Sequence, residues 1–425
     1  MADSKILFSL EGKGLKLDSA ADIESHIAAL RANDAVEEVR LLGNTYGVEA
    51  CRVLGEVLAT KKSLKVANLA DMFTGRLLNE IPEALSYLLT SILNLPNLTT
   101  VNLNDNAFGI NTVAPLVAFL SAHVPLQHLY LNNNGLGPEA GTLVANALSE
   151  LHAKKESARK DGTAVPDLET VICGRNRLEN GSMKAWAKTF SLHNKVQTIK
   201  MVQNGIRQDG ISHLLSSGLN NLLALQTLDL QDNTFTIKGA RVLAKVAPTW
   251  TDLRELGVGD SLLGAKGGVL LSQALLEGKN KNLETLRLQY NEITADAVKG
   301  LADAAKLALP ALKRIELNGN KLLEDDESIL ALQTLLDDRK EKTAGDLVIE
   351  DEWGVDSLSD LEEPDSEEEE EEEAETEEEE EEEEDVEKKA EKDIKDAEIA
   401  QKEPVAQRQD KDVDELASKL EKTNI

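Results

Sequence analysis

Amides and arginines in short, repeated turns are the residues of this sequence whose types and spacing suggest chemistry. One turn reads Asn132-Asn133-Asn134, and a later turn carries Arg175 and Arg177. An amide donates and accepts hydrogen bonds while it stays neutral, and an arginine offers five donors in a planar fork. Polar groups of this kind fix the orientation of a protein partner at an interface. The turns therefore favour the recognition of a protein surface.

Motifs of an autonomous enzyme are missing from the sequence. The stretch Gly259–Lys266 resembles a phosphate-binding loop, but the Lys-Ser/Thr pair that should directly follow its second glycine is absent. The six histidines are scattered without metal-ligand spacing, and no serine elbow or Cys/His pairing occurs. The two cysteines, Cys51 and Cys173, are too few for a disulfide framework or a thiolate metal cluster. We therefore expect a binding protein that has no cofactor or metal of its own.

The turns belong to an internal repeat. Residues 126–137 read L-x-x-L-x-L-x-x-N-x-L-G, which is the strand-and-turn unit of a leucine-rich repeat. Near-copies succeed one another at steps of 28 to 30 residues, apart from one step of 34 and one of 42. A weaker first unit near Phe8 brings the array to about eleven repeats. The residues that align with Asn134 are Asn44, Met72, Asn106, Asn176, Asn204, Asn233, Ser261, Asn291 and Asn320.

A period of 28–29 residues accommodates one short strand and one full helix in each unit. After the turn, residues 137–148 place apolar side chains at helical spacing, with Pro138 in the first turn. We therefore predict an α/β fold, a leucine-rich-repeat solenoid or crescent with an inner parallel β-sheet and outer helices. This domain, with its end caps, is expected to span residues 1–354. The aligned asparagines should point inward and bond the backbone of adjacent turns.

Two irregular steps and the end of the array need separate interpretation. The step of 42 residues contains the charged stretch 151–167, which we expect to be a tolerated surface loop. The step of 34 contains an unusual turn, 70–82, on the strand-to-helix side where the Asn-rich turns also lie. Residues 328–336 should form a final helix, and residues 346–350 with Trp353 should close the exposed end.

Charge divides the chain into a mildly acidic body and a strongly acidic tail. The formal net charge is −31, and residues 350–385 hold 25 Asp or Glu and no Lys or Arg. We predict a disordered acidic tail over 355–390 and a charged tail over 391–425 with a short helix at 413–422. The acidic block has two interpretations, a solubilising tail or electrostatic steering toward a basic partner.

The same composition bears on location and partners. A mildly acidic body lacks the clustered cations that binding to nucleic acid requires. The first residues lack the pattern of a signal peptide, and no run approaches 18 apolar residues. We therefore expect a soluble, intracellular protein with neither nucleic acid nor membrane as a partner.

Neighbours of the aligned residues should face solvent along one rim. Each of them taken alone is compatible with a solvated turn, but together they form a ridge of amides and charges suited to docking. We predict contact with a protein partner for Asn104, Asp105, Asn132, Arg175, Arg177, Gln203, Arg207, Asp232 and Tyr290.

Several strings exceed what the repeat demands and carry a family resemblance. The chain resembles the Ran GTPase-activating proteins, in the form found in fungi, over roughly residues 5–350. The resemblance is carried by residues 73–76 (FTGR), 129–138, 172–184, 201–207, 228–236 and 286–293.

The resemblance implies that the chain binds Ran in its GTP state and speeds hydrolysis of that GTP, in support of nucleocytoplasmic transport. The chain would then be an activator rather than an enzyme, because hydrolysis, GTP and Mg²⁺ all belong to the partner. It also implies a cytoplasmic monomer, with the nuclear envelope or shuttling as alternatives, and a Ran-binding protein as a further candidate partner.

Two residues receive roles from the resemblance. The family is understood to orient the GTPase's own glutamine through a rim asparagine that fixes a partner tyrosine, and this asparagine corresponds to Asn133. Arg76 corresponds to an arginine needed for activity as an interface or structural residue, with an arginine finger as the alternative. The sequence departs from the family at Leu78, where relatives carry a basic residue.

Two rival functions use the same observations differently. A pure binding solenoid, such as a cytosolic nuclease inhibitor or a scaffold, shares the period. It would be expected to be Cys-rich and to lack the FTGR turn. An acidic nuclear chaperone for basic proteins would depend on the tail alone and leaves the rim unexplained.

Overall fold

A computed structural model of the chain describes residues 6–344 and 353–362. They belong to a compact unit, Met1–Pro364, and the remaining unit is Asp365–Ile425. Residues 346–350, which we expected to help close the exposed end, lie outside the described residues. The same holds for residues 363–390 of the predicted acidic tail and for the charged tail 391–425 with its predicted helix at 413–422.

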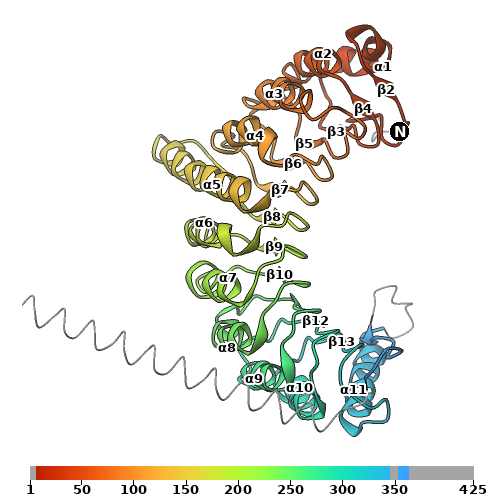
Figure 1. Cartoon of the computed structure of the whole chain (residues 1–425), viewed down its shortest axis with the longest axis vertical. Coiled ribbons are helices and arrows are strands. Elements are labelled where there is room, and N and C mark those ends of the chain that lie inside the picture. Colours follow the sequence, from red (N-terminus) through yellow and green to blue (C-terminus); the bar gives the residue numbers. More distant parts are fainter. Residues whose placement is uncertain (1–5, 345–352, 363–425) are drawn as a thin grey trace, which may run out of the picture. The chain divides into compact units, whose positions relative to one another are not determined.

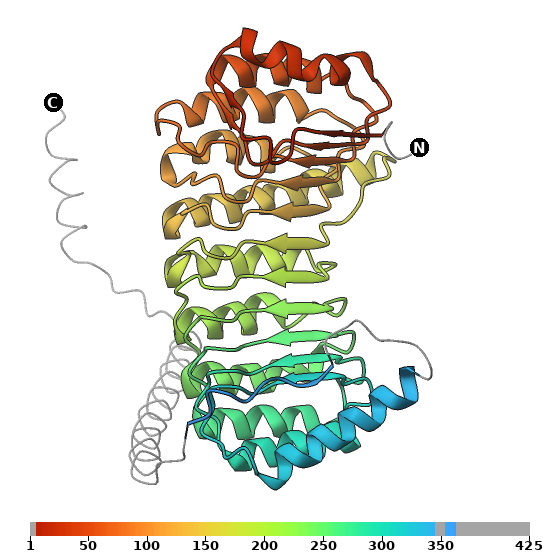
Figure 2. The same cartoon turned by 90° about the vertical axis from the view of Figure 1, so that its right-hand side faces the viewer.

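The centre of the described unit is a parallel sheet of 12 strands that follow one another in chain order. Most strands have three residues, of which the middle one is buried, such as Leu129 in β7. Figure 2 shows the strands stacked in register along the unit. The strands are β1 (Leu7–Ser9), β3 (Glu38–Arg40), β5 (Val66–Asn68), β6 (Thr100–Asn102), β7 (His128–Tyr130), β8 (Thr170–Ile172), β9 (Thr198–Lys200), β10 (Thr227–Asp229), β11 (Glu255–Gly257), β12 (Thr285–Arg287), β13 (Arg314–Glu316) and β14 (Gly354–Val355).

The helices lie on the outer side of the repeat array, and the sheet forms its inner side (Figure 1). The long helices are α1 (Ala20–Ala32), α2 (Val48–Leu58), α3 (Ile81–Ile92), α4 (Val113–Leu120), α5 (Gly137–Lys160), α6 (Glu179–Leu192), α8 (Thr236–Val246), α9 (Gly264–Leu276), α10 (Ala295–Leu307) and α11 (Glu327–Ala344). Short helical segments are η2 (Ile110–Thr112), α7 (Gln208–His213), η3 (Leu214–Leu219) and η4 (Ala247–Thr249).

One continuous apolar core lies between the sheet and the helices. In the repeat that contains β7, Leu126, Leu129 and Leu131 point into it, and Val144 and Leu148 of α5 meet them from the helix side. Each unit thus buries one strand face and one helix face against its neighbours, as a solenoid requires. The predicted leucine-rich-repeat fold is confirmed.

The aligned asparagines form a ladder inside the turns, as expected. Asn134 is fully buried, and its Nδ2 donates to the carbonyls of Leu103 and Leu131 at 2.9 and 3.0 Å. Its Oδ1 accepts the N–H of Asn106 at 3.0 Å, and its own N–H donates to Oδ1 of Asn176 at 3.0 Å. One side chain therefore pairs backbone groups of its own turn and of the preceding turn, which would otherwise be buried without partners.

A second row of donors closes the opposite edge, where helices lead into strands. These side chains reach back to carbonyl groups near the end of a helix in the preceding repeat, a position that favours donors and cations. The row includes Lys61, His123, Lys155, Trp250, Asn280 and Arg339. His193 also bonds the preceding repeat, at the carbonyl of Leu148 within α5.

The stretch 151–167 is not the surface loop that we expected, because α5 continues to Lys160. Lys155 is 1% exposed, and its Nζ donates to the carbonyls of Val124, Leu126 and Pro166, each at 2.7 Å. Arg159 pairs with Asp167 at 2.6 Å in the segment that follows the helix. The charged residues of the insertion thus extend the helix and fasten the return to β8.

The C-terminal end of the array lies beyond the boundary that the sequence suggested at residue 354. Val355 pairs with Ile315 of β13, so β14 adds one more parallel strand. The carboxylate of Asp356 accepts the N–H of Leu317 at 2.7 Å, and the indole of Trp353 donates to the carbonyl of Leu336 at 2.8 Å. Residues 353–362, which we call the end segment, therefore belong to the repeat unit.

A small second sheet lies at the N-terminal end. Its strands, β2 (Lys16–Leu17) and β4 (Thr45–Tyr46), are parallel and follow the turns after β1 and β3. Across residues 6–344 and 353–362, no helix has the length and apolar character needed to cross a membrane.

Replacing Lys155 should test whether the extended helix is fastened by its ammonium group. We expect Lys155→Met to lower the free energy of unfolding by about 2 to 3 kcal/mol, because buried carbonyls lose their donor. The measurement is urea unfolding followed by circular dichroism. The matched control is Lys154→Met, the exposed lysine beside it on α5, which should change stability little. Equal effects of the two substitutions would contradict this role.

Candidate functional site

A row of residues with left-handed backbone conformation forms the rim of the array, at the edge where strands lead into helices. The residue directly before each ladder position has a positive φ, between 45° and 73°. In most of these residues the N–H donates to a carbonyl of the following turn, as Asn133 does to Gly174 at 2.9 Å. Asn, Asp and Gly tolerate this conformation best, and other residues pay about 1 kcal/mol. We call this set the rim row: Gly43, Asp71, Asp105, Asn133, Arg175, Gln203, Asp232, Asp260, Tyr290 and Gly319.

Asn133 lies exposed in this row, at a φ of 54°. Its Nδ2 donates to Oδ1 of Asp105, one repeat earlier, at 2.9 Å. Because the backbone is held by the ladder and the amide by Asp105, the side chain has a defined direction. The structure therefore separates the triplet as expected, with Asn134 inside the ladder and Asn133 on the surface.

Asn104 and Asn132 are half-buried and take part in backbone hydrogen bonding. Oδ1 of Asn104 accepts the N–H of Asn132 at 2.7 Å, and Oδ1 of Asn132 accepts the N–H of Gly174 at 2.6 Å. Both were predicted to contact a partner, and the structure gives their oxygens a structural use. Sequence reasoning missed this second set of bonds because the position is asparagine in only part of the array.

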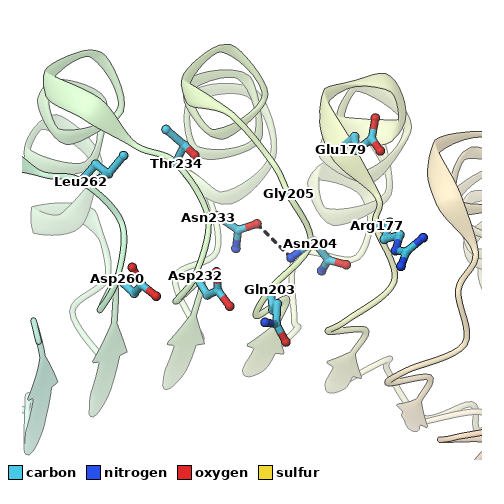
Figure 3. A pocket seen from close by; sticks show the side chains of 10 residues that line it. All are labelled: Arg177, Glu179, Gln203, Asn204, Gly205, Asp232, Asn233, Thr234, Asp260 and Leu262. Atoms are coloured by element: carbon cyan, nitrogen blue, oxygen red, sulfur yellow. Dashed lines mark hydrogen bonds between the residues drawn. The ribbon is translucent and has the colours of Figure 1, made fainter. Parts of the chain in front are cut away.

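Arg175, Arg177, Gln203 and Arg207 are exposed on neighbouring turns, and some of the rim side chains surround a depression of about 440 Å³. Figure 3 shows this depression, with the bond between Asn204 and Asn233 on its inner side. Its lining residues are Arg177, Glu179, Gln203, Asn204, Gly205, Asp232, Asn233, Thr234, Asp260 and Leu262.

Two carboxylates of the rim row lie on this depression. Desolvation raises the pKa of Asp232, and the neighbouring charge of Asp260 raises it further. Asp260 was not predicted from the sequence, because its ladder residue is Ser261 and the Asn-rich signature of the turn is missing. The alignment of the repeats alone could have found it.

Arg76 is held inward rather than extended over the rim. Its side chain is 9% exposed, and its guanidinium pairs with the Asp18 carboxylate at 2.5 Å. Its Nε also donates to Oγ1 of Thr45 at 2.8 Å. This hydrogen bond from Arg76 lowers the pKa of Asp18. The guanidinium is therefore bonded within the chain and does not extend over the rim.

Tyr290 is 47% exposed but already has a partner within the chain. Its hydroxyl donates to Oδ2 of Asp360 in the end segment at 3.0 Å, and Asn318 donates to the same carboxylate at 3.1 Å. This hydrogen bond raises the pKa of Tyr290. The end segment thus reaches the rim at its C-terminal end, which no local pattern in the sequence indicated.

The fold and the rim together define the class of protein. The family model described as "Leucine Rich repeat" matches residues 224–244 and 279–302. With its parallel sheet and outer helices, the chain is a leucine-rich-repeat protein.

Similarity to known proteins identifies the family within this class. The chain is 40% identical over 340 residues to Ran GTPase-activating protein 1 of Saccharomyces cerevisiae, which covers 78% of this chain and 82% of that protein. It therefore belongs to the Ran GTPase-activating protein family. It is also 42% identical over 201 residues to Ran GTPase-activating protein 1 of Xenopus laevis, which covers 47% of this chain and 34% of that protein. Similarity to the ribonuclease inhibitor of Sus scrofa is lower, 23% over 321 residues, which covers 67% of this chain and 64% of that protein.

The raised pKa of Asp232 predicts a pH-dependent stability. Between the ordinary pKa of 3.8 and the raised value, the folded chain binds more protons, so stability falls as the pH rises through this window. Asp232→Asn should therefore increase the melting temperature at pH 7, and the gain should vanish near pH 3, below the ordinary pKa of 3.8. The control is Asp252→Asn, at an exposed position in the loop before β11. A gain at pH 3 equal to that at pH 7 would contradict the assignment.

Proposed function

We propose that this chain is a GTPase-activating protein for Ran, which binds Ran in its GTP state and speeds hydrolysis of the bound GTP in support of nucleocytoplasmic transport. Two relatives from distant organisms bear the name of this activity, and one is similar over most of both chains. The structural observation that supports the proposal best is the rim row, in which a neutral amide projects from a backbone fixed by the ladder.

Hydrolysis of GTP is limited by the placement of the attacking water and by the charge that develops on the transferred phosphoryl group. In our proposal Asn133 fixes a tyrosine of the partner and so orients the GTPase's own glutamine. One hydrogen of its Nδ2 is held by Asp105, which leaves the carbonyl oxygen and the second hydrogen for the partner. The hydrolysis, the GTP and the Mg²⁺ remain those of the partner.

Arg76 acts in this proposal through the shape of the rim and not at the phosphoryl group. A finger arginine must reach the phosphate, whereas this guanidinium is 9% exposed and bonded to Asp18 and Thr45. Removal of Arg76 would therefore reduce activity by loosening the turn in which it lies.

The remaining rim residues would provide docking contacts. Asp105, Arg175, Arg177, Gln203 and Arg207 are exposed on consecutive turns, so a single partner surface could meet all of them. We further propose that the chain acts as a monomer in the cytoplasm, and that a Ran-binding protein joins the complex.

A variant at Asn133 tests the proposed mechanism. Asn133→Gly keeps the left-handed turn, since glycine adopts positive φ freely, and removes only the amide. We expect single-turnover hydrolysis of GTP by Ran, with catalytic amounts of the chain, to slow by on the order of a hundredfold.

The matched control is Glu292→Gly, at another left-handed position that we assign no contact. This variant should accelerate hydrolysis as the unmodified chain does. If the unmodified chain failed to accelerate hydrolysis, the proposed function would be wrong. If Asn133→Gly remained fully active, the function would stand and the role of Asn133 would fall.

A further inference from the structure

Two adjacent leucines stand exposed on the unusual turn between β5 and α3. Leu77 and Leu78 directly follow Arg76, and they are 65% and 63% exposed. A single exposed leucine is common on protein surfaces, but neighbouring large apolar residues on a docking edge suggest a contact. The turn follows its strand, so it lies on the same edge as Asn133.

The base of this turn is fixed in place. Phe73 is 4% exposed, and its ring lies 6.4 Å from the ring of Phe108 between centroids. The hydroxyl of Thr74 donates to the carboxylate of Asp71 in the rim row at 2.5 Å. The leucines are therefore carried by an ordered turn, so their exposure does not come from a loose loop.

Arg76 fastens the turn to the small N-terminal sheet. Its guanidinium bonds the carboxylate of Asp18, which directly follows β2, and both the hydroxyl and the carbonyl of Thr45 in β4. The N–H of Tyr46 in β4 donates to the carbonyl of Met72 at 3.1 Å. The β2–β4 sheet thus serves as a support for the turn.

We propose that Asp18 and Thr45, acting through Arg76, hold Leu77 and Leu78 on the rim as an apolar contact for the GTPase partner. This inference rests on the proposed function. We assign this contact to the GTPase because the turn is continuous with the rest of the rim. β5 lies two strands from β7, so the strand spacing places the turn about 10 Å from the turn of Asn133. A partner that reaches Asn133 would therefore also cover this turn. Asp18 and Thr45 are positioning residues, since they touch Arg76 and not the partner.

The test replaces both leucines by serine, which should leave the fold intact because both side chains are exposed. We expect KM for GTP-loaded Ran to rise at least tenfold. The Kd for Ran that carries a non-hydrolysable GTP analogue should rise by the same factor. The value of kcat should stay unchanged, because the contact lies outside the reacting groups. The matched control is Leu223→Ser, 64% exposed in the loop before β10 at the opposite edge, which should bind and act normally.

Asp18→Asn tests the positioning role separately. It should raise KM in the same way with kcat preserved, and it should add little to the leucine substitutions, because both act on one contact. Asp18→Glu, which keeps the charge, should restore part of the affinity. A merely structural role would lower the melting temperature and the active fraction without this selective change in KM.

The outcomes distinguish the two proposals. Binding without acceleration by the unmodified chain would defeat the proposed function alone, while leucine variants that bind normally would overturn the present inference alone. If the unmodified chain did not bind Ran, both would fall. If light scattering showed a dimer that the leucine substitutions dissociate, a second copy would be the occupant and the inference would be wrong.

Discussion

The structure depends on satisfying the hydrogen bonds of buried turns. Each repeat must bend sharply between strand and helix, and the backbone groups of the bend lie inside the array. An asparagine at the ladder position solves this problem, since its amide provides a donor and an acceptor at once. The same local geometry places the preceding residue in the left-handed region, where several side chains, including that of Asn133, are exposed. The core and the rim thus have a common origin.

The two edges of the array are consequently different. Along the helix-to-strand edge, side chains such as Lys155 and Arg339 are bonded to several carbonyls of the preceding repeat. Along the strand-to-helix edge, Asn133 and the arginines near it are exposed. At the two ends of this second edge, the β2–β4 sheet and the end segment contact the rim through Arg76 and Tyr290. Between these two contacts the rim is exposed to solvent.

The fold could be predicted from the sequence because the same strand-and-turn pattern recurs in nearly every repeat. The sequence predicted the buried leucines, such as Leu126, Leu129 and Leu131, and the ladder asparagines. Their contacts are with equivalent residues of adjacent repeats, so the period alone determines them. Contacts between residues that are not equivalent in adjacent repeats could not be predicted in this way. The bonds from Arg76 to Asp18 and from Tyr290 to Asp360 span 58 and 70 residues. The helical course of 151–160 was missed because its charged residues are typical of a loop, while the burial of Lys155 depends on three carbonyls supplied by other segments.

We propose that the rim row is the surface that meets GTP-loaded Ran. Hydrogen–deuterium exchange of the chain, alone and with Ran bound to a non-hydrolysable GTP analogue, tests it most directly. We expect slower exchange at residues 71–78, 104–107, 132–135 and 175–178, with little change in the outer helices α3, α5 and α6. Protection confined to those outer helices, with the turns exchanging as in the free chain, would contradict it.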